Sequence, residues 1–161
     1  MGEATDEAIG FPRGTADERE LLLSWLGYLR GAVLRKIDGL DDEQARWRPD
    51  GRLLPLLGIA HHLTNVEARW IDGGYFGGET SRSDDEPLDV HELTIDAVIR
   101  AYEDRAEATD SAVRSLPLDS PHPYRPDVDL RWVLLHLINE TARHAGHADS
   151  VRELLDGTTG E

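Results

Sequence analysis

The sequence predicts an all-α protein, folded as a single antiparallel four-helix bundle with a short extra helical turn after the first long helix. Two observations lead to this fold class. Four long segments repeat apolar residues at steps of three and four, the spacing of one face of an α-helix. No segment alternates with a period of two over a useful length, so no sheet is expected. Because each helix can bury its apolar face only against the others, a bundle follows.

The first long helix is expected to begin at Thr15-Ala16-Asp17-Glu18, which has the spacing of a capping box. Asp38-Gly39 ends it, and residues 41–47 can form the short extra turn. Residues 1–14 are then a loose N-terminal segment, and the domain spans 15–157. The apolar face of this helix consists of Leu22, Trp25, Leu29, Val33 and Ile37.

The second long helix is predicted from Pro55, a residue tolerated in a first helical turn, to about Trp70. A glycine-rich turn at 72–78 and an acidic polar loop at 79–89 follow, and the sequence indicates no role for this loop. The apolar face of the helix consists of Ile59, Leu63, Val66 and Trp70.

Thr94 can cap the third long helix, and residues 117–127, with four prolines, connect it to the fourth. Asp129 caps the fourth helix, which extends to Leu155 before Asp156-Gly157 stops it. The apolar face of the third helix consists of Ile95, Val98, Tyr102, Ala106, Thr109, Val113 and Leu116.

The composition excludes several classes of function. The formal net charge is −15, from 32 acidic and 17 basic residues, so a nucleic-acid or anionic-membrane partner is not expected. The chain has no cysteine, which excludes disulfides, thiolate metal ligands and a cysteine nucleophile. No apolar run approaches the ~20 residues of a membrane span, and the N-terminus lacks the pattern of a signal peptide. A cytoplasmic protein is therefore predicted.

The fourth helix is expected to direct a carboxylate and an imidazole toward the core. At ~100° per residue, its apolar side chains fall within a wedge of roughly 80°, with His144 near the middle and Glu140 at the edge. A glutamate that faces a core is costly unless it is paired or binds a metal. His62 lies beside the apolar face of the second helix. The three side chains could hold Zn²⁺, Ni²⁺, Fe²⁺ or Mn²⁺ and leave coordination positions open.

A metal-free core explains the same residues equally well, as a hydrogen-bonded Glu140–His144 pair with His62 nearby. The helical wheel does not distinguish the two. The other histidines are interpreted as surface or loop residues (His61, His91 and His122) or as partly exposed helix residues (His136 and His147), and Trp25, Trp70 and Trp132 as core or rim residues.

The segment from Gly58 to Trp70, GIAHHLTNVEARW, resembles the second-helix motif of the DinB/YfiT-like superfamily, in which His-Leu is followed by Val-Glu and an aromatic residue. The segment from Leu130 to Asp149 is similar to the last-helix signature of the mycothiol S-transferase-like branch. The resemblance is specific in the last helix, moderate in the second, and only architectural over the rest of 17–157. It implies a DinB-like bundle with one divalent metal, usually zinc or nickel, held by three side chains.

In many members of this superfamily the last helix supplies two histidines four residues apart. Here Glu140 stands at the earlier position, a departure that matches the maleylpyruvate isomerase-like and thiol transferase-like members, which use His, Glu and His. The resemblance therefore implies His62, Glu140 and His144 as the ligands, the same residues that the helical wheel selects.

A metal with open positions can ionise a bound nucleophile. Since the chain has no cysteine, a thiol nucleophile would come from outside; the resemblance implies mycothiol or another low-molecular-weight thiol, transferred to a small electrophilic substrate. Arg143 could bind a carboxylate or phosphate of the ligand, and His147 could relay a proton. Both residues also fit an ordinary ion pair on the helix surface.

Two other functions stay open. One is a thiol-independent, metal-dependent isomerase or hydrolase on the same scaffold. The other is a non-catalytic stress-response or binding module with a structural or vestigial metal. No P-loop, dinucleotide fingerprint or serine nucleophile elbow is present. The expected partner is a small molecule, and a homodimer is favoured because superfamily members are commonly dimers.

Overall fold

The computed structural model of the chain describes residues 11–14 and 17–160. Most of the predicted loose segment 1–14, and the predicted capping residue Thr15, lie outside this part. The described residues are mostly helical, as the sequence predicts. Their elements are α1 (Glu18–Arg35), α2 (Asp42–Arg46), the 3₁₀ turn η1 (Pro49–Gly51), α3 (Leu56–Ala68), the π-helical turn η2 (Arg69–Gly73), α4 (Ile95–Arg114), β1 (Pro121–His122), β2 (Arg125–Asp129) and α5 (Leu130–Asp156).

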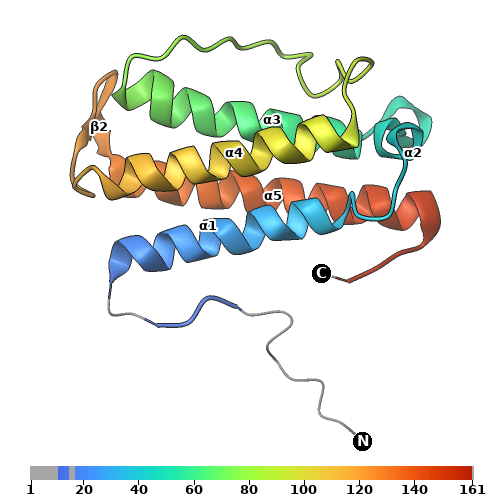
Figure 1. The fold of residues 1–161 in the computed structure, drawn as a ribbon, viewed down its shortest axis with the longest axis horizontal. Helices are drawn as coiled ribbons and strands as arrows, with labels where there is room; N and C mark the ends of the chain where they lie inside the picture. Colours follow the sequence, from blue (N-terminus) through green and yellow to red (C-terminus); the bar gives the residue numbers. More distant parts are fainter. Residues whose placement is uncertain (1–10, 15–16, 161) are drawn as a thin grey trace, which may run out of the picture.

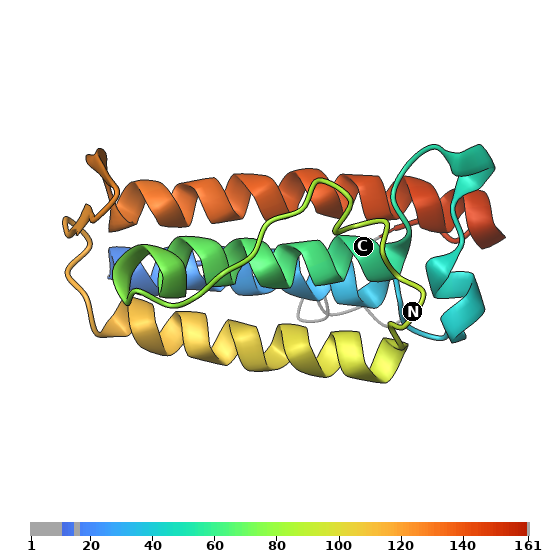
Figure 2. The ribbon, with the colours of Figure 1, turned by 90° about the horizontal axis from the view of Figure 1, so that it is seen from above.

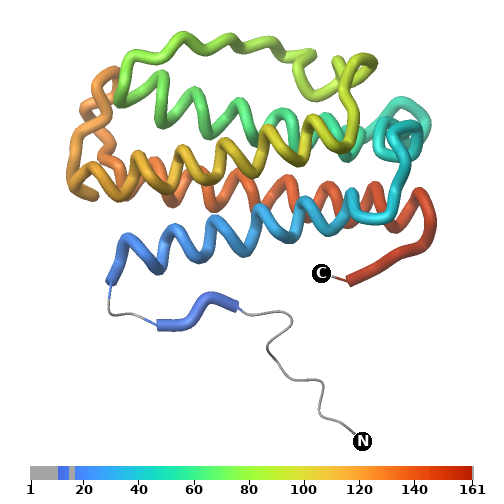
Figure 3. The backbone as a smooth tube through the Cα atoms, viewed as in Figure 1, coloured from blue at the N-terminus to red at the C-terminus, as the bar shows by residue number. Residues whose placement is uncertain are grey.

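The long helices α1, α3, α4 and α5 lie side by side (Figures 1 and 3). Helices α1 and α5 run in the same direction: Glu18 at the start of α1 pairs with Arg131 at the start of α5 (2.5 Å), and Lys36 after α1 pairs with Asp149 late in α5 (2.9 Å). Helices α3 and α4 are also parallel to each other (Figure 1). The predicted antiparallel arrangement is thus wrong for these two pairs, although it holds for α1 against α3 and for α4 against α5.

The parallel course of α3 and α4 explains the long connection between them. Since α3 ends at one end of the molecule and α4 begins at the other, residues 74–94 return along the whole length of α3 (Figure 2). The loop lies directly on the helix near Gly58, where a Cβ atom would be 1.8 Å from the carbonyl oxygen of Pro87. The acidic segment 79–89 therefore packs against α3.

Short polar side chains cap the first turns of α1, α2, α4 and α5. Asp17 accepts a hydrogen bond from the Glu20 amide (3.1 Å), so α1 begins at Glu18. The predicted caps of α4 and α5 are confirmed, since Thr94 accepts from the Ala97 amide (3.3 Å) and Asp129 from the Trp132 amide (2.9 Å). The short extra turn is confirmed as α2, which has a capping box.

The expectation of no sheet is wrong between α4 and α5. Strands β1 and β2 form a small antiparallel hairpin, with Pro121 opposite Asp129 and His122 opposite Arg125. Strands this short give no readable alternation, which is why the sequence shows only a proline-rich connection. The helix that begins at Leu56 also continues further than predicted, because η2 carries it through Gly73 into the glycine-rich turn.

The interior contains two apolar clusters with an ionic group among the long helices. Arg30 of α1 donates to both carboxylate oxygens of Glu67 of α3 (2.8 and 2.7 Å) and to Asp110 of α4 (3.0 Å). Glu67 is 1% exposed, so this group ties three helices together inside the protein. In the described part of the chain, no helix is long and apolar enough to cross a membrane.

Candidate metal centre

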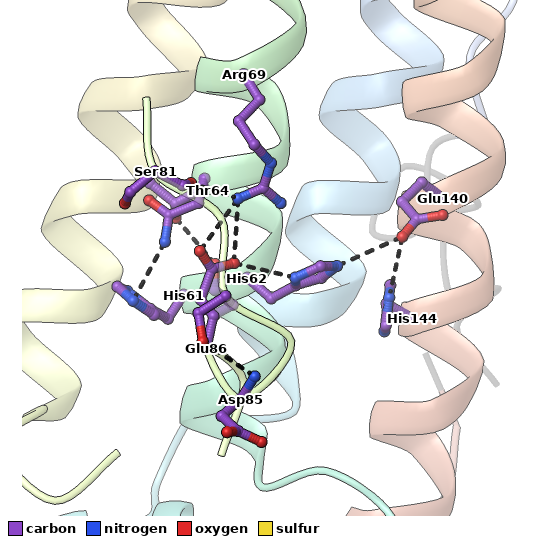
Figure 4. A network of polar contacts seen from close by, with 12 residues as sticks. His61, His62, Thr64, Arg69, Ser81, Asp85, Glu86, Glu140 and His144 are labelled. Carbon is purple, nitrogen blue, oxygen red and sulfur yellow. Dashed lines mark hydrogen bonds and ion pairs between the residues drawn. The ribbon is translucent and has the colours of Figure 1, made fainter. Parts of the chain in front are cut away.

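His62, Glu140 and His144 converge between α3 and α5 (Figure 4). The Oε1 atom of Glu140 lies 3.4 Å from Nε2 of His62 and 3.3 Å from Nε2 of His144. All three potential ligand atoms lie within 4.8 Å of one another. The structure thus brings together the residues that the helical wheel selects.

The sequence accounts for this placement helix by helix. Glu140 and His144 are four residues apart on α5, so their side chains lie one above the other on one face. That face is buried, and His144 is only 8% exposed. On α3, His62 stands between the buried residues Ile59 and Val66 and projects toward α5.

The two nitrogen–oxygen distances around Glu140 fit a shared divalent ion. Ligands at ~2.0–2.1 Å from a tetrahedral ion are ~3.3–3.4 Å apart, which the two nitrogen–oxygen distances match. A direct charge-assisted hydrogen bond would be shorter, about 2.7–2.9 Å. Two imidazoles and one carboxylate also form a donor set that Zn²⁺ and its neighbours accept.

The protonation states suit metal binding. Burial raises the pKa of Glu140, but electrostatic attraction to the neighbouring imidazoles of His144 and His62 outweighs burial and lowers it overall. Burial, helped by repulsion from His62, lowers the pKa of His144 against the attraction of Glu140. A carboxylate and a neutral imidazole at neutral pH are the forms that bind metals.

Glu86, in the long connection, contacts the outer side of His62. Its Oε1 lies 3.2 Å from Nδ1 of His62, and Arg69 donates to both carboxylate oxygens (3.1 and 3.4 Å; Figure 4). Sequence reasoning missed Glu86, because one glutamate among several in an acidic loop carries no signal. Its contact with His62 depends on where the loop lies on α3.

A pocket of about 390 Å³ opens beside the centre. Trp70 and His136, whose ring centroids are 4.8 Å apart, form an aromatic wall, and His136 also stacks on Trp132. Arg82 lies on the loop side and has no ion-pair partner among residues 11–14 and 17–160. The remaining lining residues include His62, Glu140, Val66, Arg69, Ser83, Asp84 and Pro87.

Arg143 and His147, the residues predicted to assist catalysis, do not line this pocket. Both are exposed on α5, and the His147 ring contacts the His144 ring edge to face at 5.3 Å. Arg143 is near enough for its charge to lower the pKa of His136, although burial is the larger cause. Their roles stay predictions.

The interpretation of His122 as a surface or loop residue is wrong in its exposure, because this side chain is 5% exposed. The hairpin folds it against Trp70 and Tyr75, with ring centroids 5.4 and 5.3 Å away. His61 lies away from the centre and contacts Asn65 (3.2 Å). The remaining interpretations hold: His91 is exposed, His136 is partly buried, and Trp25, Trp70 and Trp132 lie at the rim.

Residues 21–157 match the model of a family described as MST, mycothiol-S-transferase. A crystal structure of a conserved protein from Enterococcus faecalis superposes with a TM-score of 0.74, covering 89% of this chain and 100% of that one at 14% identity. This likeness shows the fold alone. No curated protein matches the chain.

Proposed function

Because the chain belongs to the mycothiol S-transferase family, we propose that it is a divalent-metal-dependent enzyme that transfers mycothiol or a similar thiol to a small electrophilic substrate. The observation that carries this proposal is the convergence of His62, Glu140 and His144 beside an open pocket. A closed structural site would use four protein ligands, whereas three leave room for an exogenous group. Zinc is the metal that best suits this donor set.

A metal held by these three side chains would supply Lewis acidity and would lower the pKa of a thiol in the pocket. The protein contributes the charge balance, because Glu140 is ionised while His144 is neutral. It also partly shields the centre from water, since His144 is buried and the loop covers α3 next to His62.

The pocket side chains suggest how substrates are oriented. The rings of Trp70 and His136 offer a flat apolar surface. The guanidinium of Arg82, which has no ion-pair partner among the described residues, can bind a polar or anionic substituent. Burial is the main cause that lowers the pKa of His136, so Nδ1 or Nε2 of its neutral ring can accept the thiol proton. This proposal moves the proton-relay role from His147 to His136.

The same proposal covers the type of bundle, the cellular location and the partners of the protein. The four long helices serve as a DinB-like four-helix bundle that brings α3 and α5 together at the centre. The protein acts in the cytoplasm on small molecules, and its net charge of −15 disfavours nucleic acid and anionic membranes as partners. A homodimer is part of the same proposal.

The test combines metal analysis with thiol titration on protein purified without an affinity tag. We expect one divalent metal per wild-type chain and almost none after His144→Ala. Arg143→Ala and His147→Ala, on the exposed side of the same helix, should keep the metal. Product formation from an electrophile should require both metal and thiol.

Three results would decide against this proposal. Full metal content in His144→Ala would refute the site. Turnover without any added thiol would favour an isomerase or hydrolase. If the absorption spectrum of the Co²⁺-substituted protein does not change when any of the thiols is added, a non-catalytic module would be favoured.

A further inference from the structure

We propose that Glu86 is a positioning residue of the metal centre. Its carboxylate holds Nδ1 of His62 and so fixes the imidazole tautomer whose Nε2 is free to bind the metal. The acidic connection between α3 and α4 thereby becomes the third element of the site, beside α3 and α5. This inference rests on the proposed metal site but not on the thiol reaction.

The two ring nitrogens of His62 point to different partners. Nδ1 lies 3.2 Å from Oε1 of Glu86, and Nε2 lies 3.4 Å from Oε1 of Glu140. A neutral imidazole carries a single N–H, so only one of these carboxylates can receive it. If the proton is on Nδ1 and is donated to Glu86, the Nε2 lone pair faces the metal position. With the proton on Nε2, the ring would donate to Glu140 and could not bind the ion.

Glu86 is itself held in place. Its side chain is 9% exposed, and a carboxylate so deeply buried is costly without partners. Arg69 supplies them by donating from Nη1 to Oε2 (3.1 Å) and Oε1 (3.4 Å). Arg69 opens the π-helical turn η2, a kind of turn that often marks functional sites. The result is a chain of contacts from Arg69 through Glu86 to His62 (Figure 4).

The backbone of the loop is fixed close to Glu86. Its neighbour Pro87 lies so near α3 that a Cβ at Gly58 would meet the Pro87 carbonyl oxygen at 1.8 Å. A tight turn also stabilises the segment, because the amides of Leu88 and Asp89 donate to the Asp85 carbonyl (2.8 and 3.0 Å). The absence of a side chain at Gly58 therefore allows the loop to bring Glu86 to His62.

The second imidazole has no such support. Nδ1 of His144 is buried and has no hydrogen-bond partner in the described part of the chain. Outer carboxylates and carbonyls that hold metal-bound histidines typically change metal affinity by about 10–100-fold. Of the two histidines of this centre, only His62 has such a contact in the described part of the chain, and Glu86 makes it, so the loss of Glu86 should be measurable.

The test compares Glu86→Ala and Glu86→Gln with Asp89→Ala, an exposed acid in the same loop that removes the same charge. Zn²⁺ affinity is measured by chelator competition on metal-free protein. We expect Glu86→Ala to bind about 10–100-fold more weakly. Glu86→Gln should lie in between, because its amide oxygen still accepts the Nδ1 proton without carrying a charge. Asp89→Ala should match the wild type.

A second readout does not depend on the metal. The ¹⁵N chemical shifts of the His62 ring in the metal-free protein report which nitrogen carries the proton. We expect the Nδ1–H tautomer in the wild type and in Asp89→Ala, and a shift toward Nε2–H in Glu86→Ala. Gly58→Ala, which displaces the loop backbone, should also weaken Zn²⁺ binding and shift His62 toward the Nε2–H tautomer, although Glu86 is still present. Circular dichroism confirms that each variant is folded.

Unchanged Zn²⁺ affinity in Glu86→Ala, or an equal loss in Asp89→Ala, would overturn the positioning role and leave the proposed function intact. An unchanged tautomer in Glu86→Ala would overturn it as well. A wild-type protein that binds no Zn²⁺ would overturn both, so the two failures are distinguishable.

Discussion

At the scale of single residues, two ion pairs of similar geometry are expected to contribute differently to stability, because one is buried and the other is exposed to water. Arg30 and Glu67 form a two-point contact at 2.8 and 2.7 Å with side chains 6% and 2% exposed. Arg114 and Glu20 form a similar contact at 2.9 Å for both bonds, but both are about half exposed, at 52% and 50%. Removing one partner leaves a charge buried away from water only in the Arg30–Glu67 pair.

We therefore predict that Glu67→Ala lowers the free energy of unfolding by about 3–5 kcal/mol, because Arg30 keeps a buried charge with Asp110 as its remaining partner. Glu20→Ala should leave stability nearly unchanged, since water replaces the lost carboxylate. Urea denaturation of both variants measures the difference. Equal losses would contradict the importance of burial.

The proposed role of His136 as the proton acceptor leads to a further prediction at this scale. His136→Gln should lower kcat for thiol transfer while the Zn²⁺ content stays at the wild-type value, because the ring lines the pocket without being a ligand. General acid–base groups typically contribute 10²–10⁴-fold, so a fall of about 100-fold is expected. His147→Gln is the matched control on the same helix. A loss confined to His147→Gln would restore the original assignment.

At the scale of elements, the buried His122 packs the hairpin β1–β2 against Trp70 of η2 and Tyr75 just after it. The Tyr124 amide donates to Nδ1 of His122 (3.3 Å), and Nε2 is buried without a partner in the described residues. Burial, followed by the charge of Arg125, lowers the pKa of His122 below its ordinary value. The neutral ring is thus the form that the folded hairpin accommodates.

This shift predicts how stability depends on pH. The unfolded chain has a histidine pKa near ~6.5, so between that value and the lower folded pKa the unfolded state binds more protons. The contribution of His122 is therefore full above about pH 6.5 and is lost as the pH falls through the folded pKa. We expect the free energy of unfolding of His122→Gln to fall less between pH 7 and 5 than that of the wild type.

The control for this comparison is His91→Gln, which removes an exposed histidine. Urea denaturation at several pH values should give it the wild-type slope. If His122→Gln retains the full slope, the dependence must come from other histidines whose pKa burial lowers, such as His136 and His144.

At the scale of the whole molecule, the metal centre joins helices that the chain connects only indirectly. His62 lies on α3, whereas Glu140 and His144 lie on α5, and residues 69–129 separate these helices in sequence. A ligand that binds only the folded state stabilises it by mass action, by about 2.7 kcal/mol at a concentration of 100 Kd. The centre should therefore couple metal binding to global stability.

We predict that the Tm of metal-free protein rises steadily with added Zn²⁺, and that His144→Ala shows no such rise. Differential scanning calorimetry across a Zn²⁺ series measures the effect. Glu86→Ala should show a smaller rise than wild type at the same Zn²⁺ concentration, because its affinity is lower. A Tm independent of Zn²⁺ in the wild type would argue against a centre that bridges the helices.

The sequence by itself determined the helices and the ligand candidates. Caps such as Thr94 and Asp129 are local properties, so they fix where helices begin. The apolar repeats predict the buried face of α3 and α5, but in α1 the structure buries Leu23 and Leu26, whereas the predicted Leu22, Trp25 and Leu29 are only partly buried. The same periodicity places Glu140 and His144 on one face of α5, because residues four apart on a helix always lie together.

Only the tertiary structure decided the direction of the helices and the outer contacts of the centre. An apolar face packs equally well in either direction, and a long connection such as 74–94 permits the parallel course that a short turn would forbid. The contact of Glu86 with His62 and the burial of His122 arise from segments without periodicity. Their positions depend on what they pack against, and that information is absent from any local stretch of sequence.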